Sequence, residues 1–313
     1  MNKLAFLYAG QGAQKVGAGQ DFYETYPAFR EILDHAPVDF DLKKVSFEGP
    51  EETLNDTRYT QPSMVAFAAG VTHLLYDEGI RPSYAAGLSL GEYSALHAAG
   101  VFDAQTAISL VAFRGKAMAE AVTDRPCKMI AVMNLDRMTL QEICERASDY
   151  GVVEISNYNC PGQLVVGGDA GAVERAAVLA VNAGARKVVP LKVSGPFHTS
   201  LMKPASQALH EKFKTISMEE MRFPVLFNCR GDLKRPEDTI PELLEKQVCS
   251  SVYLEDTIHR MADLGVDTVV EIGPGRALSN FVRRTEKGIT CYSVETVADL
   301  ERTVSALKEV CSS

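Results

Sequence analysis

A serine flanked by glycines is the sharpest chemical signal in the sequence. The run Gly87-Leu88-Ser89-Leu90-Gly91 has the Gly-x-Ser-x-Gly pattern and stands between a strand-like and a helix-like segment. That context is typical of a nucleophile elbow, in which the glycines allow a tight turn and the serine is exposed. The helix N-terminus that follows favours a developing negative charge. The pattern therefore predicts a nucleophilic serine, with a glycine-rich turn that has no chemistry as the alternative.

A serine hydroxyl needs a base to become a nucleophile, so the six histidines are the candidates. Four of them fall inside predicted helices, where a packing or surface role is favoured: His73, His97, His210 and His259. His35 has no neighbours that suggest chemistry. His198 follows the loop Ser194-Gly195-Pro196-Phe197, and loops at strand ends often carry catalytic groups. His198 is therefore the predicted base, with a structural histidine as the alternative.

No carboxylate between Ser89 and His198 is an evident third member of a triad. Asp169 and Glu154 fall in segments where we expect them to face solvent. A main-chain or amide carbonyl could accept the Nδ1–H of the imidazole instead and so fix its tautomer. The residues themselves therefore leave the acidic position open.

Arg114 places a permanent cation inside an otherwise apolar helix-like run. In one interpretation the side chain reaches solvent and pairs with a glutamate such as Glu120. In the other, its planar guanidinium binds a substrate carboxylate, which would offset the cost of burying the charge. The pattern alone does not choose between the two.

The turn Gly10-Gln11-Gly12-Ala13-Gln14 follows the first predicted strand and can present backbone N–H groups. In hydrolase-like folds one oxyanion donor is the residue after the nucleophile, here Leu90, and the other comes from a second strand-end loop. Gln11 is the candidate for that second donor. The turn lacks the Gly-x-x-x-x-Gly-Lys-Ser/Thr pattern of a phosphate loop.

The composition excludes several functional classes. With 32 Lys and Arg against 41 Asp and Glu, the net charge of −9 argues against a general grip on nucleic acid. The longest apolar stretch, residues 64–71, is much shorter than a membrane span. The seven cysteines show no zinc-ligand spacing and indicate reduced thiols. We expect a cytoplasmic protein with no metal, no cofactor, and no nucleic-acid or membrane partner.

Strand-like and helix-like segments alternate along the chain, which is typical of α/β folds with a mostly parallel sheet. We interpret residues 4–8 as a buried strand and not as a leader. Further strands are expected at 84–88, 225–229 and 268–272, and helices at 62–76, 92–99, 106–122, 203–216 and 296–310. Residues 127–193, ending in a strand at 186–193, follow the ferredoxin-like strand-helix-strand-strand-helix-strand order. The length of 313 residues then suits a large α/β-hydrolase-like catalytic domain, residues 1–126 and 194–313, with 127–193 as an inserted ferredoxin-like subdomain.

Over essentially its whole length, the chain resembles the malonyl-CoA:acyl carrier protein transacylases of type II fatty acid synthesis and the related acyltransferase domains of polyketide synthases. The segments that carry the resemblance are Gly10–Gln14, Gly87–Leu96, Arg114–Met118, Asn157–Gln163, Pro196–His198 and Glu271–Gly275. Together they are far more specific than any one of them. One departure is Leu88, where the commonest family form has a histidine that is not the base.

The resemblance implies a two-step covalent mechanism. Ser89 takes the malonyl group of malonyl-CoA as an ester, and the pantetheine thiol of holo acyl carrier protein then removes it. His198 is implied as general base and acid, oriented by the main-chain carbonyl of Gln247. Arg114 is implied to hold the malonyl carboxylate.

The resemblance also assigns residues around the substrate. Gln11 and Leu90 are implied to supply the oxyanion-hole amides, and Met118, Asn159 and Phe197 to contact the substrate. A large residue before the histidine, here Phe197, resembles the malonyl-selecting form of the polyketide domains.

An acidic carrier protein would need a local basic patch on this acidic chain. Arg186, Lys187 and Lys192, on the last strand of the predicted insert, are the candidates, and a solvated strand face is the alternative. Two other functions remain open. A serine hydrolase or thioesterase with the same serine and histidine would release free malonate, and a non-catalytic carrier-docking module would form no adduct on Ser89.

Overall fold

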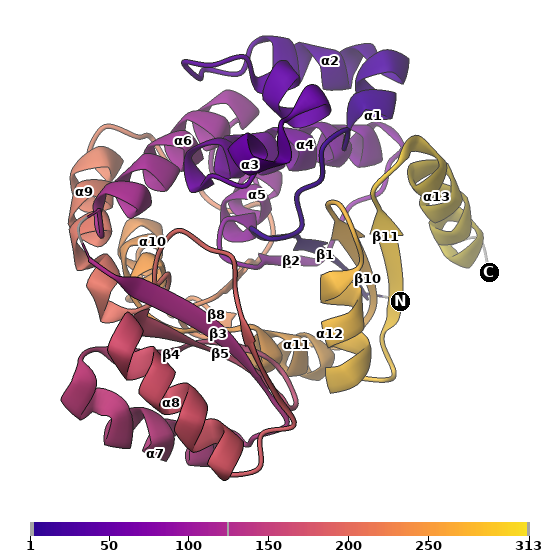
Figure 1. Cartoon of the computed structure of the whole chain (residues 1–313). Coiled ribbons are helices and arrows are strands. Elements are labelled where there is room, and N and C mark those ends of the chain that lie inside the picture. Colours follow the sequence, from indigo (N-terminus) through magenta and orange to yellow (C-terminus); the bar gives the residue numbers. More distant parts are fainter. Residues whose placement is uncertain (1–2, 124, 312–313) are drawn as a thin grey trace. The chain divides into compact units, whose positions relative to one another are not determined.

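The computed structural model describes residues 3–123 and 125–311. The chain divides into two compact units, each described below by itself. The first consists of Met1–Gly115, Ile216–Leu226 and Met261–Ser313, and the second of Lys116–Thr215 and Phe227–Arg260. The four-stranded sheet is parallel, the five-stranded sheet is mostly antiparallel, and β7 and β8 form a third sheet of two strands, so the fold is α/β with mixed sheets (Figure 1).

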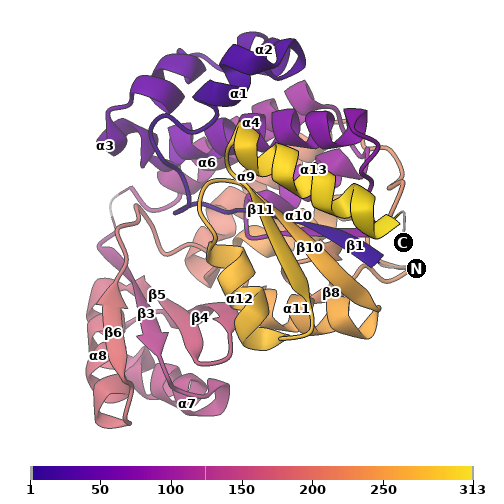
Figure 2. The ribbon, with the colours of Figure 1, turned by 90° about the vertical axis from the view of Figure 1, so that its right-hand side faces the viewer.

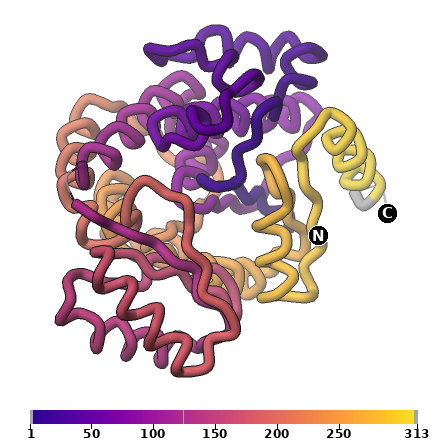
Figure 3. Tube along the Cα trace, in the orientation of Figure 1, coloured from indigo at the N-terminus to yellow at the C-terminus, as the bar shows by residue number. Residues whose placement is uncertain are grey.

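The first unit is built on four parallel strands in the order β11-β10-β1-β2. These strands are β1 (Lys3–Tyr8), β2 (Tyr84–Gly87), β10 (Val266–Ile272) and β11 (Thr290–Val294). β1, from the start of the chain, pairs with β10 from near its end, and the tracing in Figure 3 shows the two segments side by side. Parallel strands end at one edge of a sheet, which is where open α/β sheets bind ligands. Ser89 follows β2 at that edge.

Helices flank this sheet. Those that begin in the first unit are α1 (Gln20–Thr25), α2 (Pro27–Asp34), α3 (Glu51–Leu54), α4 (Thr57–Asp77), α5 (Gly91–Ala98), α6 (Ala104–Glu120), α12 (Ala277–Thr285) and α13 (Val297–Cys311), with a π-helical turn at Lys44–Glu48. The helix expected at 62–76 begins already at Thr57, because the Asp56 side chain accepts the N–H of Arg58 at 2.9 Å and caps it. Pro62 therefore lies inside α4 and not in its first turn.

The second unit contains a five-stranded sheet in the order β6-β3-β5-β4-β9, antiparallel except for the β4–β9 pair. Its strands and helices are β3 (Cys127–Met133), α7 (Arg137–Ala147), β4 (Val153–Cys160), β5 (Gln163–Asp169), α8 (Ala170–Asn182), β6 (Lys187–Pro190), α9 (Lys203–Phe213), β7 (Leu226–Phe227), β8 (Asp232–Leu233), α10 (Ile240–Val248), β9 (Val252–Tyr253) and α11 (Leu254–Asp263), with 3-10 turns at Ser148–Tyr150 and Ser200–Met202. Side chains of α7 and α8 pack on β3, β4 and β5 in one apolar core.

Two strands are shorter than the sequence predicts. β6 covers only Lys187–Pro190 of the expected 186–193, because the chain leaves the sheet after the bond from the Leu191 N–H to the Met129 carbonyl. Only Leu226–Phe227 of the expected strand at 225–229 pairs as a strand. Among the described residues, no helix is long and apolar enough to cross a membrane.

Glu271, at the end of β10, holds the start of α12. Its carboxylate accepts the N–H groups of Leu278 at 3.0 Å and Ser279 at 2.7 Å, and burial raises the pKa of this side chain. We expect Glu271→Ala to lower the free energy of unfolding by about 1–3 kcal/mol, because two buried donors lose their acceptor. Urea denaturation followed by circular dichroism measures the change. An unchanged midpoint would show that the cap contributes nothing.

Candidate active site

Ser89 occupies a strained turn between β2 and α5. Its φ of 56° lies in the left-handed region, which is uncommon for a residue with a side chain. A Cβ on Gly87 would come within 2.0 Å of the Gly91 carbonyl carbon, and a Cβ on Gly91 within 2.3 Å of the Tyr8 oxygen. Both glycines are therefore required by close backbone packing. The strand, turn and helix of the predicted elbow are all present.

Arg114 lies directly beside the serine. Its side chain is fully buried, its Nη2 donates to the Ser89 Oγ at 3.1 Å, and its Nη1 donates to the Gln61 Oε1 at 2.8 Å. The guanidinium carbon is also 5.4 Å from the centre of the Tyr93 ring. Burial lowers the pKa of Arg114 from its ordinary value, yet a guanidinium remains charged at neutral pH. The predicted alternative, an arginine that reaches solvent beside Glu120, is wrong.

Gln61 is a residue that the sequence reasoning missed. It lies in the first half of α4, its side chain is 1% exposed, and it orients Arg114. In the sequence, this glutamine stands just before Pro62 and a long apolar run. Because the helix is predicted to begin at residue 62 and begins in fact at Thr57, Gln61 falls outside the predicted helix. A polar side chain in a buried helical segment usually has a polar partner.

The two predicted oxyanion donors have N–H groups without protein acceptors. Within residues 3–123 and 125–311, the main-chain N–H groups of Gln11 and Leu90 make no hydrogen bond. A Cβ on Gly10 would lie 2.5 Å from the Leu88 oxygen, so the loop that carries Gln11 packs tightly against the elbow. The Gln11 side chain is held by a 2.8 Å bond to Thr57. Orphan N–H groups of this kind suit a developing oxyanion.

His198 is held by a backbone carbonyl. Its side chain is 4% exposed, its φ is 60°, and its Nδ1 lies 2.8 Å from the Gln247 oxygen. A carbonyl can only accept, so Nδ1 carries the proton and Nε2 of the neutral ring carries the lone pair. The main-chain oxygen of Gln247, a fully buried residue, thus orients the imidazole in the way that the carboxylate of a catalytic triad would.

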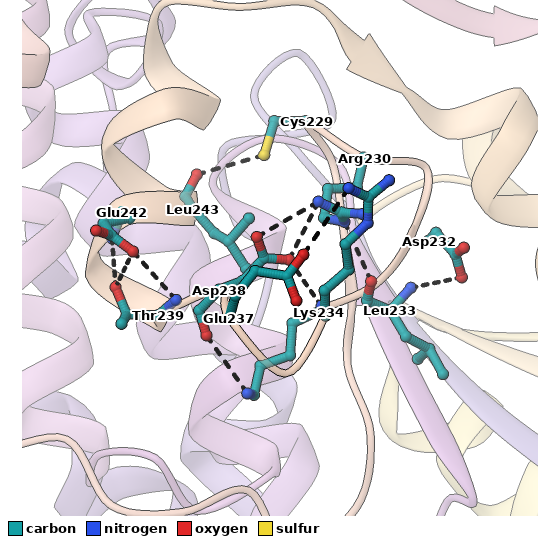
Figure 4. Close-up of polar contacts among 11 residues, drawn as sticks. Cys229, Arg230, Asp232, Leu233, Lys234, Glu237, Asp238, Thr239, Glu242 and Leu243 are labelled. Atoms are coloured by element: carbon teal, nitrogen blue, oxygen red, sulfur yellow. Dashed lines mark hydrogen bonds and ion pairs between the residues drawn. The ribbon is translucent and has the colours of Figure 1, made fainter.

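The helix that presents this carbonyl, α10, is held at its start by side-chain interactions. At its start, Thr239 and Glu242 form a capping box, and Arg230 pairs with Asp238 at 3.1 Å in the preceding loop (Figure 4). Gln247 lies in the last turn of α10, where carbonyls have no intrahelical partner. The hydrogen bond to His198 therefore uses an acceptor that the helix itself leaves available.

The sequence analysis predicts that Glu154 and Asp169 face solvent, and this prediction is wrong because both carboxylates bind protein groups. Glu154 accepts the N–H and the hydroxyl of Ser200 at 2.8 and 2.6 Å, which anchors the loop just after His198. Asp169 pairs with Arg125 and accepts the N–H of Val152 at 2.8 Å. Both carboxylates are bound because each faces a backbone N–H and a side-chain donor, the Ser200 hydroxyl for Glu154 and the Arg125 guanidinium for Asp169.

The other predicted substrate residues belong to the second unit. Met118, Asn159 and Phe197 are all buried there. The Oδ1 of Asn159 has no hydrogen-bond partner in the described part of the chain. An unsatisfied buried oxygen of this kind is an acceptor available to a ligand.

The three cations predicted to meet a carrier do not share one strand. Arg186, Lys187 and Lys192 are all exposed, but only Lys187 lies in β6. Side chains alternate between the faces of a strand, so Lys187 points away from Val188, which packs on the core of α7 and α8. The predicted placement of all three cations on the last strand of the insert is therefore wrong. Among residues 3–123 and 125–311, no three His, Cys, Asp or Glu side chains are placed to hold a metal ion.

Comparison with known proteins identifies relatives over the full length. The model of the acyl transferase domain matches residues 5–310. A Bacillus subtilis protein named malonyl CoA-acyl carrier protein transacylase is 38% identical over 312 residues, 99% of this chain and 98% of that protein. The crystal structure of the protein of the same name from Clostridium perfringens is 39% identical, with a TM-score of 0.94 over 98% of both chains.

One similar solved structure is a complex. It is described as a type II PKS acyl-carrier protein in complex with its malonyl-transacylase. That chain is 34% identical, with a TM-score of 0.94 over 97% of this chain and all of its own.

Proposed function

The chain belongs to the acyl transferase domain family, and we propose that it transfers a malonyl group from malonyl-CoA to the pantetheine thiol of holo acyl carrier protein. The observation that carries this proposal is Arg114, a buried cation bonded to the hydroxyl of Ser89 at the nucleophile elbow. A nucleophile beside a guanidinium suits an acyl group that ends in a carboxylate.

In the first step, the Ser89 Oγ attacks the thioester carbon of malonyl-CoA while His198 Nε2 accepts the hydroxyl proton. The negative oxygen of the tetrahedral intermediate is stabilised by the N–H groups of Gln11 and Leu90. The carbon–sulfur bond then breaks, and the proton held by His198 passes to the departing sulfur. The products are malonyl-Ser89 and CoA.

The second step is the same chemistry in reverse order. His198 accepts the proton of the carrier's pantetheine thiol, and the sulfur attacks the ester carbon of malonyl-Ser89. The bond to the serine oxygen breaks and His198 returns the proton to it. The hydrogen bond from Nδ1 to the Gln247 carbonyl supports this role, because it fixes Nε2 as the reactive nitrogen.

Several finer assignments accompany this proposal. The large domain, residues 1–126 and 194–313, is proposed to be hydrolase-like, with 127–193 as a ferredoxin-like insert, which the strand order β6-β3-β5-β4 supports. Met118, Asn159 and Phe197 are proposed to contact the substrate, and Arg186, Lys187 and Lys192 to attract the carrier from separate positions. The free thiols of the described cysteines support a reducing, cytoplasmic location.

The partition of the malonyl group tests the function against its rivals. Malonyl-CoA with a labelled malonyl group is incubated with the protein, with and without holo carrier, and malonyl-carrier and free malonate are quantified. We expect label to reach the carrier and little free malonate to form. Fast release of free malonate that holo carrier does not reduce would identify a hydrolase. Unchanged malonyl-CoA would identify a docking module.

Gln61 is expected to tune malonyl selectivity through Arg114. In Gln61→Leu, Nη1 of a buried guanidinium loses its acceptor, and the guanidinium is no longer held toward Ser89. We expect kcat/KM for malonyl-CoA to fall about tenfold, in line with about 1.5 kcal/mol for a hydrogen bond to a charged group. The ratio of malonyl-CoA to acetyl-CoA turnover measures this. An equal loss with both donors would reduce Gln61 to a packing role.

A further inference from the structure

A basic pocket of about 490 Å³ lies in the first unit, away from the residues assigned above. Its floor is the edge strand β11, and α12 and α13 pack against that strand; Figure 2 shows them to either side of it. Arg276, Arg283 and Arg302 line the pocket together with Tyr292 and Ser293. Three guanidinium groups, two from α12 and its N-cap and one from α13, therefore meet at one concave surface, which Asp299 and Glu309 also line.

Two of these arginines form no salt bridge among the described residues, although Arg283 is close enough to Glu271 for its charge to act on that buried carboxyl. In the part of the chain that the structure describes, the Arg276 side chain makes no ion pair or hydrogen bond, and the Arg283 side chain donates to the Cys291 carbonyl at 3.4 Å. Arg302 pairs with Asp299, which also caps α13 through the Thr296 N–H. Exposed arginines that form no salt bridge within the protein are available to an anionic ligand.

We propose that this arginine pocket binds the phosphate groups at the nucleotide end of CoA. The inference rests on the proposed function, because CoA is the donor of the malonyl group. The 3′-phosphate and the diphosphate of CoA are multiply charged, and guanidinium groups bind phosphate oxygens in pairs. Tyr292 offers an aromatic face for the adenine ring.

The position in the sheet is compatible with this assignment. β11 and β2 are the two outer strands of the four-stranded sheet, so three strand spacings separate them. At about 4.8 Å per spacing the span is roughly 14 Å. The extended pantetheine arm of CoA is long enough to bridge this separation across the sheet. The phosphates would anchor the donor, and the thioester would reach the nucleophile.

The experiment compares donors with and without the phosphates. Arg276→Gln/Arg283→Gln is assayed with malonyl-CoA, malonyl-dephospho-CoA and malonyl-pantetheine, with holo carrier as acceptor. We expect the ratio of kcat/KM for malonyl-CoA to that for malonyl-pantetheine to fall about tenfold or more. The dephospho donor distinguishes the 3′-phosphate from the diphosphate. Arg146→Gln, an exposed arginine in α7, is the matched control and leaves the ratio unchanged.

An unchanged donor ratio in the double variant would overturn the proposal. So would an increase of KM confined to the holo carrier, which would assign the arginines to an acidic protein partner. Binding of adenosine 3′,5′-bisphosphate, measured by calorimetry, is a readout that needs no turnover. We expect it in the parent protein and at least a tenfold loss in the double variant. If no donor is turned over, the proposed function fails, while the calorimetric measurement still shows whether the pocket binds the nucleotide phosphates.

Discussion

Replacing Ser89 by alanine is expected to lower kcat for malonyl transfer by about 10⁴-fold or more. Without the hydroxyl no ester can form, and only binding and the oxyanion donors remain, as in other enzymes that lose a serine nucleophile. The measurement is the initial rate of malonyl-carrier formation at saturating malonyl-CoA. Thermal denaturation of the same variant establishes that the loss is chemical and not a failure to fold.

Ser94→Ala is the matched control for this variant. Ser94 lies in α5, one turn beyond the elbow, and its buried hydroxyl has no hydrogen-bond partner among the described residues. Its removal should leave the rate within a few-fold of the parent protein. Activity retained in Ser89→Ala at a comparable level would contradict the covalent mechanism and favour direct attack on bound malonyl-CoA.

Replacing Arg114 by alanine is expected to lower kcat/KM for malonyl-CoA by roughly 10²-fold or more. The variant removes a buried charge from the partner carboxylate, a loss of about 2–5 kcal/mol. Acetyl-CoA has no carboxylate at this position, so its kcat/KM should fall far less. The ratio of the two values, measured with the same acceptor, isolates recognition of the carboxylate from general damage to the site.

Arg114→Lys keeps the charge but cannot bind Gln61 and a carboxylate with the same planar geometry. We expect an intermediate preference for malonyl-CoA in this variant. A malonyl to acetyl ratio that is the same in the parent protein, Arg114→Ala and Arg114→Lys would assign Arg114 to packing and not to the substrate.

The elbow could be predicted from the sequence because its geometry is local. A Cβ on Gly87 or Gly91 would lie only 2.0 or 2.3 Å from a backbone atom, so the presence of glycine at both positions indicates the turn. The partner of Arg114 could not be predicted in the same way, because Gln61 lies 53 positions away in another helix. No periodicity within one segment shows which distant side chain will satisfy a buried cation.

The hydrogen-bond acceptor of His198 is another contact that the sequence alone could not predict. A main-chain carbonyl leaves no mark on the residue type, so spacing alone could not find Gln247, and only the family resemblance pointed to it. The structure places that carbonyl 2.8 Å from Nδ1. Glu154 was misjudged for a related reason: its acceptors are used by Ser200, a residue distant in sequence.

The strand β6 also shows why single-segment patterns fail at the ends of elements. An apolar and basic run favoured a long strand, but pairing with β3 stops at Pro190. Where a strand ends depends on its partner, and Lys192 lies outside the strand for that reason. The proposed carrier-binding cations are therefore separate exposed side chains rather than one strand face.

The most direct test of the central claim is mass spectrometry of the protein after brief incubation with malonyl-CoA, followed by addition of holo carrier. We expect one malonyl group per chain, mapped to the peptide that contains Ser89, and its quantitative appearance on the carrier after the chase. An adduct on another residue, no adduct at all, or an adduct that decays to free malonate without reaching the carrier would contradict the account.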